Sequence, residues 1–145
     1  MGETEAPVGS DQKQIGEVAD RTGLSLRTIR YYEEVGLVTP SSRSQGGFRL
    51  YSEPDIARLE LVKRMKPLDF SLEEMRDLLV LLDSLEKGGS SATEDEALLD
   101  RLAMYRLAAE ERCTSLRAQL TSAEQFADSL RRETRRRRKV MDPSR

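Results

Sequence analysis

Residues 27–37 read RTIRYYEEVGL, and residues typical of helix ends occur near both limits of this stretch. Ser25 precedes it, at the position where a side-chain hydroxyl accepts a hydrogen bond from a free amide at a helix start. Gly36 follows the two glutamates, where the end of a helix commonly needs a residue in the left-handed conformation. These signals predict one short helix that begins just after Ser25 and ends at Gly36.

The outer face of this predicted helix carries the chemistry of nucleic-acid binding. Leu26 and Ile29 point to the opposite side, where they would seat the helix on its domain. Arginine donates two parallel hydrogen bonds to phosphate or guanine, a tyrosine hydroxyl donates to phosphate, and a helix of this width enters the major groove of DNA. The four residues that share the outer face at helical spacing are Arg27, Arg30, Tyr31 and Glu34.

Both flanks of the helix indicate a winged helix-turn-helix. The segment QIGEVADRTG, residues 14–23, predicts a shorter helix that ends at Gly23. Two short helices joined by a few residues that include a glycine form a helix-turn-helix unit. Downstream, Gly46 and Gly47 separate two short stretches and predict a hairpin, because glycine supplies the positive φ of tight turns. We expect this hairpin to form a small β-wing.

Two further helices complete the expected DNA-binding domain, which we bound at residues 13–85. Ser52 would cap the first of them, whose apolar residues recur at helical spacing. Ser71 and Glu74 form the capping-box pattern that starts the second. Residues 1–12 are expected to be a disordered tail, and residues 86–93 have the composition of a linker.

Residues 94–132 predict a long dimerisation helix. Its apolar residues follow steps of three and four, with one irregular step between Ala109 and Cys113. A long helix with a narrow apolar stripe needs a partner helix, and the simplest supplier is a second copy of the chain. We therefore expect a homodimer whose seam consists of Leu98, Leu102, Tyr105, Ala109, Cys113, Leu116, Leu120, Ala123, Ala127 and Leu130.

The composition argues against an enzyme. The chain has no His, so it lacks the Ser-His-Asp and Cys-His arrangements and any Cys/His zinc site. Its single Cys excludes an internal disulfide and fits a reducing cytoplasm. No apolar run approaches the length of a membrane span, and the first residues lack the pattern of a signal peptide. We expect a cytoplasmic, nucleoid-associated protein with no metal, cofactor or membrane partner.

The charges are segregated along the chain. Residues 12–67 hold ten Lys and Arg against seven Asp and Glu, whereas residues 68–130 hold six against fourteen. Residues 133–145 form a basic C-terminal tail, which could contact phosphates, contact the acidic segment, or simply be solvated. A mildly basic first half beside an acidic second half indicates that a polyanion touches only part of the molecule.

The motifs RTIRYYEEVGL, GGFRLYS and FSLEEM, in this order within residues 14–82, resemble the N-terminal winged-helix domain of MerR-family transcription regulators. The long helix after them is similar to the antiparallel dimerisation coiled coil of that family. The resemblance implies a mainly α fold, in which a winged helix-turn-helix with a small β-hairpin wing precedes a long antiparallel coiled-coil helix. It also implies double-stranded DNA as the partner of a homodimer.

The same resemblance implies which residues touch DNA. From the recognition helix they are Arg27, Thr28, Arg30, Tyr31 and Tyr32, from the first wing Arg43, Phe48, Arg49 and Tyr51, and from the second wing Lys63, Arg64 and Lys66. The chain departs from the family at Asp69, where a Gly usually precedes the Phe. Aspartate tolerates the left-handed conformation, but its charge would weaken a contact with phosphate.

The function implied is a sequence-specific regulator that binds a pseudo-palindromic promoter site. Such a dimer bends and untwists the spacer between the −35 and −10 elements, and so controls transcription by RNA polymerase indirectly. An architectural winged-helix protein that bends DNA away from promoters is the alternative, and a coiled-coil adaptor is a third reading. Cys113 is a possible thiol sensor, although a Cys on a heptad seam is also an ordinary small apolar residue.

Overall fold

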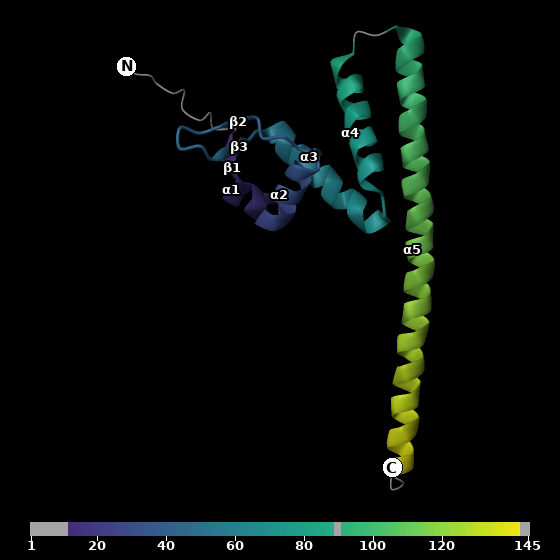
Figure 1. Ribbon diagram of the computed structural model, residues 1–145. Coiled ribbons are helices and arrows are strands. Elements are labelled where there is room, and N and C mark those ends of the chain that lie inside the picture. The colour runs from purple at the N-terminus through teal and green to yellow at the C-terminus, as the bar shows by residue number, and fades with distance from the viewer. Residues whose placement is uncertain (1–11, 89–90, 143–145) are drawn as a thin grey trace. The chain divides into compact units, whose positions relative to one another are not determined.

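The computed structural model describes residues 12–88 and 91–142, and the expected N-terminal tail lies outside the described residues except for Gln12. The chain divides into two units, residues 1–102 and residues 103–145. Within the first unit the helix-turn-helix consists of α1 (Ile15–Thr22) and α2 (Leu26–Glu34). Figure 1 shows these two helices beside the small sheet.

Three very short strands form the sheet. β1 (Lys13–Gln14), β3 (Arg49–Tyr51) and β2 (Ser42–Arg43) lie in that order, and both pairings are antiparallel. The hairpin between β2 and β3 is the wing predicted from the glycine pair. β1 was not expected, because two polar residues beside a helix carry no strand pattern of their own and depend on β3 for their pairing.

The remaining helices of the first unit begin at the capping residues that the sequence indicated. α3 (Glu53–Met65) starts after Ser52, and α4 (Leu72–Lys87) starts after Ser71; both have a complete capping box. A single 3₁₀ turn, η1 (Lys66–Leu68), lies between them. The capped starts satisfy amide groups that have no partner inside a helix, which explains why each helix begins where it does.

The core of the first unit is built from apolar side chains of α1, α2, β3, α3 and α4 and of the loop residues Leu37, Val38 and Phe70. The four residues of α3 that the helical spacing selected are all buried, namely Ile56, Leu59, Val62 and Met65. They pack with side chains from α1, α2, β3 and α4, which include Val18, Ile29, Tyr32, Leu50, Tyr51, Leu79 and Leu81. Leu26, expected on the inner face, is instead 41% exposed, because it is the first residue of α2, nearly one turn before Ile29.

The last helix, α5 (Ala92–Met141), is 50 residues long, and none of its residues is buried. It begins two residues before the expected coiled-coil boundary and continues through residues 133–141, which the sequence suggested as a tail. Arginine and lysine are good helix formers, and Glu133 forms ion pairs with Arg136 and Arg137, both at 2.7 Å. These local interactions explain why the basic run is helical.

The prediction of a mainly α chain with a winged helix-turn-helix and a long C-terminal helix is confirmed. None of the described helices combines the length and the apolar character that a membrane span requires.

Candidate nucleic-acid interface

Local hydrogen bonds fix the start of α2. Gly23, with a φ of 75°, ends α1 by donating its amide to the carbonyl of Ala19 at 2.8 Å. Ser25 then accepts the amide of Thr28 at 3.0 Å, and its hydroxyl lies 2.9 Å from that of Thr28. Thr28, one of the expected DNA contacts, is therefore half-buried and part of the helix cap.

The end of α2 is fixed by its own backbone and by α4. Gly36 adopts a φ of 85°, and the amide of Leu37 donates to the carbonyl of Tyr32 at 2.9 Å. The guanidinium of Arg76, on α4, donates to the carbonyl of Val35 at the same helix end. The start of α2 is therefore fixed by its own cap, and its end is held in addition by α4.

The two faces of α2 differ sharply in exposure. Ile29 and Tyr32 are buried, and burial raises the pKa of the Tyr32 hydroxyl, with a smaller contribution from Tyr31. Arg27 and Arg30 are exposed, and Tyr31 is 46% exposed although its ring centroid lies 5.8 Å from that of Tyr32. Arg27, Arg30 and Tyr31 therefore share the open face, whereas Tyr32 supports it from the core.

The wing is a tight loop that exposes an aromatic ring. The amide of Ser44 donates to the carbonyl of Phe48 at 2.8 Å, and Gly47, with a φ of 84°, donates to Ser44 at 2.9 Å. Arg43 donates to the carbonyl of Gly47 at 2.9 Å, so its guanidinium lies against the loop. Phe48 is 62% exposed at the wing tip and makes the largest apolar contribution to this surface.

Strand β3 joins the wing to α2. The Nε atom of Arg49 lies 2.8 Å from the carboxylate of Glu33, so the one wing arginine on this strand is tied to the recognition helix. Tyr51 is buried, its hydroxyl has no hydrogen-bond partner among the described residues, and burial is the largest cause of its raised pKa. Arg49 therefore holds the wing against α2, and Tyr51 anchors it in the core.

The second wing consists of η1 and the turn that follows it. Lys63 donates to the carbonyl of Thr22 at 2.5 Å and so closes the end of α1, whereas Arg64 and Lys66 are exposed. Asp69 ends the turn with a φ of 63°, the conformation that glycine adopts most readily. The negative charge of Asp69 therefore lies three residues along the chain from the positive charge of Lys66.

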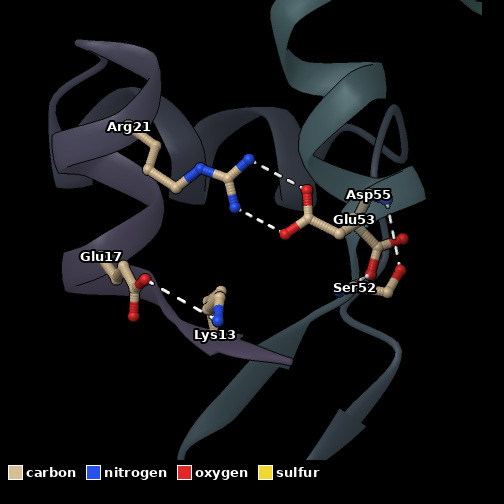
Figure 2. A network of polar contacts seen from close by, with 6 residues as sticks. All are labelled: Lys13, Glu17, Arg21, Ser52, Glu53 and Asp55. Atoms are coloured by element: carbon tan, nitrogen blue, oxygen red, sulfur yellow. Dashed lines mark hydrogen bonds and ion pairs between the residues drawn. The ribbon is translucent and has the colours of Figure 1, made fainter. Parts of the chain in front are cut away.

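Ion pairs away from this surface hold α1 against α3. Figure 2 shows Arg21 donating two hydrogen bonds to Glu53, at 2.6 and 2.9 Å, beside the Lys13–Glu17 pair and the capping box of Ser52 and Asp55. The hydrogen bond from Arg21 lowers the pKa of Glu53, and the pKa of Arg21 is correspondingly raised.

The expected contact residues thus separate into two groups. Within the described part of the chain, the side chains of four cations on this surface make no hydrogen bond or ion pair, namely those of Arg27, Arg30, Arg64 and Lys66. Arg49, Lys63 and Arg76 are bound to other elements. Nothing in the sequence indicated the role of Arg76, because its partner lies 41 residues away and leaves no local pattern.

The seam residues of α5 form a separate surface. Leu116, Leu120 and Leu130 are exposed, and Leu98, Leu102, Tyr105, Ala109 and Cys113 are half-buried. Cys113 is free. In residues 12–88 and 91–142, no three His, Cys, Asp or Glu side chains are grouped so as to hold a metal ion.

Comparisons with known proteins agree with this geometry. A family model described as the MerR HTH family regulatory protein matches residues 14–81, and a second, described as MerR, DNA binding, matches residues 56–132. The mercuric resistance operon regulatory protein of Bacillus cereus is 44% identical over 70 residues, which cover 48% of this chain and 53% of that protein. The transcriptional regulator HmrR of Rhizobium leguminosarum bv. viciae is 39% identical over 80 residues, which cover 55% and 61%.

Solved structures show the same fold. HiNmlR, a MerR family regulator that lacks the sensor domain and was crystallised on promoter DNA, superposes with a TM-score of 0.57. The match covers 81% of this chain and 79% of that one, at 19% identity, so it concerns the fold alone. The chain spans a little over half the length of the curated relatives it matches.

Proposed function

The chain belongs to the MerR family of regulatory proteins, and we propose that it acts as a homodimer that binds a pseudo-palindromic promoter site and distorts it to control transcription. In this proposal it works in the cytoplasm, on the nucleoid, and influences RNA polymerase through the shape of the promoter.

The observation that carries the proposal is the open face of α2. Arg27 and Arg30 are exposed cations without an acidic partner among the described residues, and Tyr31 lies exposed beside them. A surface helix without a ligand would usually pair such arginines with its own carboxylates, and here Glu33 is used by Arg49 instead. The open face of α2 therefore offers the donors of Arg27, Arg30 and Tyr31 beside one exposed carboxylate, Glu34, and these donors supply the chemistry that phosphate and guanine require.

The structure suggests how the twelve expected contact residues divide their work. Arg27, Arg30 and Tyr31 would read the major groove, and Arg43 with Phe48 would contact the backbone beside it. Arg64 and Lys66 would contact phosphates from the second wing. The other five would position these groups, since they are buried or bound elsewhere: Thr28, Tyr32, Arg49, Tyr51 and Lys63.

Dimer formation is supported by α5. None of the 50 residues of α5 is buried, and beyond the ion pair between Arg101 and Asp77 of α4 little tertiary packing supports the length of this helix. Its exposed leucines are covered if a second copy packs along it, and a two-fold dimer presents two recognition helices to two half-sites. Bending and untwisting the spacer then costs about 1–6 kcal/mol, which the two sets of contacts must offset.

Footprinting tests the proposal against the architectural alternative. The purified protein would be used to select genomic fragments, and the bound fragments would be probed with DNase I. A two-fold symmetric footprint between −35 and −10 elements, with a hypersensitive step at its centre, is the expected result. Protection without symmetry, spread over fragments that contain no promoter, would instead identify a DNA-bending protein that does not act on promoters.

A further inference from the structure

The last three turns of α5 carry a dense group of positive charges that the expected DNA contacts leave unused. Residues 131–139 contain seven Lys and Arg and a single acid, Glu133. The helix continues through this segment to Met141, and all seven cationic residues are exposed. The charges therefore lie on a formed helix, at set positions around its axis.

Glu133 divides these cations into two sets. It binds Arg136 and Arg137, both at 2.7 Å, and the hydrogen bonds from Arg136 and then Arg137 lower the pKa of its carboxyl. Among the described residues, four other cations make no ion pair, and we call them the basic face: Arg132, Arg135, Arg138 and Lys139. At 100° per residue these four lie within an arc of about 120°, on the side of the helix away from Glu133.

Two carboxylates border the basic face. Asp128 is bound by Arg131 at 2.6 Å, so its charge is already compensated. Asp142 lies at the other end, where it lines a hollow of about 460 Å³ together with Arg135, Arg138, Lys139 and Met141. Three cations thus surround this hollow against one carboxylate, and an anion that approaches it meets a net positive charge.

The dipole of the helix accounts for only part of this charge. Cations near a helix C-terminus are favourable, but the effect falls off within the last turn. Arg138 and Lys139 lie in that turn, whereas Arg132 and Arg135 lie further back. Arg132 donates only to the hydroxyl of Ser129, at 3.4 Å. The local structure therefore gives these two arginines no strong partner.

The geometry of the basic face suits the phosphates of duplex DNA. Its four cations extend over roughly 10 Å of helix length, and about six phosphates occur along the same length of a DNA duplex. Three of the four are arginines, whose guanidinium groups bind phosphate with two parallel hydrogen bonds. Because the helix is already formed, binding would not have to order the backbone that carries them.

The acidic segment of the chain, residues 68–130, is a less suitable partner. Glu74 and Glu94 are used in the caps of α4 and α5. Other carboxylates of this segment are bound by arginines that lie outside the basic face: Asp77 by Arg101, Asp83 by Arg58 and Glu110 by Arg106. Much of the segment's negative charge is thereby compensated, whereas each phosphate of DNA carries a full charge.

We propose that the basic face is a second DNA-binding site, which holds the phosphate backbone of a duplex without reading its sequence. The inference takes DNA as the ligand from the proposed function and goes beyond it, because this site lies on α5 and uses none of the twelve expected contact residues. It adds affinity for any duplex and leaves the choice of sequence to α2.

Paired charge removals in the full-length protein test this site. Arg135→Gln/Lys139→Gln takes two charges from the basic face, and Arg136→Gln/Arg137→Gln, the matched control, takes two from the side of Glu133. Glutamine is nearly as good a helix former as arginine and lysine, so both variants should keep the helix content of the wild type by circular dichroism. Dissociation constants would be measured on a duplex of unrelated sequence between about 50 and 200 mM salt.

The face variant should lose roughly tenfold affinity at about 0.1 M salt, and its salt slope should fall by about 0.9 for each phosphate contact removed. The control should keep the slope of the wild type, because charges on the other side of a helix about 10 Å wide are largely screened at this salt concentration. An unchanged slope in the face variant, or equal losses in both variants, would overturn the proposal.

Two further readings separate this site from α2 and from contacts within the protein. The face variant should lose the same factor on the operator as on unrelated DNA, so that the ratio of the two dissociation constants stays that of the wild type. A wild type without preference for any operator would contradict the proposed function, while the slopes on unrelated DNA would still decide about the basic face. A lower Tm of the DNA-free face variant, with the control unaffected, would show that the face binds the protein itself and would overturn the second site.

Discussion

The Nε atom of Arg49 lies 2.8 Å from one carboxylate oxygen of Glu33 and 2.9 Å from the other. This ion pair joins strand β3 of the wing to the last turn of α2. It removes one arginine from the set that DNA can attract, and it neutralises one of the two glutamates that would otherwise repel phosphate. This contact therefore fixes the wing and neutralises Glu33, while Glu34 stays exposed on α2.

The coupling between Arg49 and Glu33 should be measurable by a double-mutant cycle. Arg49→Ala, Glu33→Ala and the double variant would be unfolded in urea. We expect a coupling free energy of about 0.5–1 kcal/mol, reduced by solvent screening because the Arg49 side chain is 37% exposed. Additive effects of the two single changes would show that the pair does not stabilise the wing.

Asp69 should limit affinity for DNA. Asp69→Asn removes the negative charge from the second wing and keeps a side chain that tolerates a φ of 63°. We expect it to bind DNA about two- to fivefold more tightly at low salt, with a steeper salt dependence. Asp69→Gly should show the same gain. If only the glycine variant gained affinity, backbone strain rather than charge would be the cause.

The hydroxyl of Tyr51 should contribute nothing to stability. It is buried without a hydrogen-bond partner among the described residues, so Tyr51→Phe removes a desolvated polar group and should leave the free energy of unfolding unchanged or raise it by up to about 1 kcal/mol. Tyr51→Ala, which empties the same site, should cost about 3–5 kcal/mol. A large loss in the phenylalanine variant would reveal a partner for the hydroxyl.

The Arg21–Glu53 pair should make stability depend on pH in the acid range. The pKa of Glu53 is lowered in the folded chain, first by the hydrogen bond from Arg21. Its contribution is therefore present above the ordinary pKa of a glutamate and is lost as the pH falls through the lowered value. The Tm difference between wild type and Glu53→Gln should shrink over that window. A constant difference would mean that the charge of Glu53 is not involved.

Much of the fold could be predicted because its signals are local. Ser25, Ser52 and Ser71 cap helices within three residues of themselves, and Gly23, Gly36 and Gly47 take positive φ where the chain turns. The site was harder to predict, because exposure depends on partners far along the chain. Tyr31 and Tyr32 are neighbours in one motif, yet only tertiary packing decides that the first is open and the second is buried.

The end of the last helix shows another limit of sequence patterns. The run RRETRRRRKV has no apolar periodicity and resembles a solvated tail, yet α5 continues through it to Met141. Its helical form depends on side-chain pairs such as Glu133 with Arg137, one turn apart, and on continuity with the helix before it. Helix propensity and local ion pairing, and not a hydrophobic pattern, explain why this segment is helical.

The open face of α2 is proposed to read DNA, and dissociation constants measured on a selected operator and on unrelated DNA test this role. Arg30→Ala should lose about 10- to 100-fold affinity for the operator and much less for unrelated DNA. Lys87→Ala, which removes one positive charge from the end of α4, should change neither markedly. Equal affinities of Arg30→Ala and wild type for the operator would show that the open face of α2 does not read DNA.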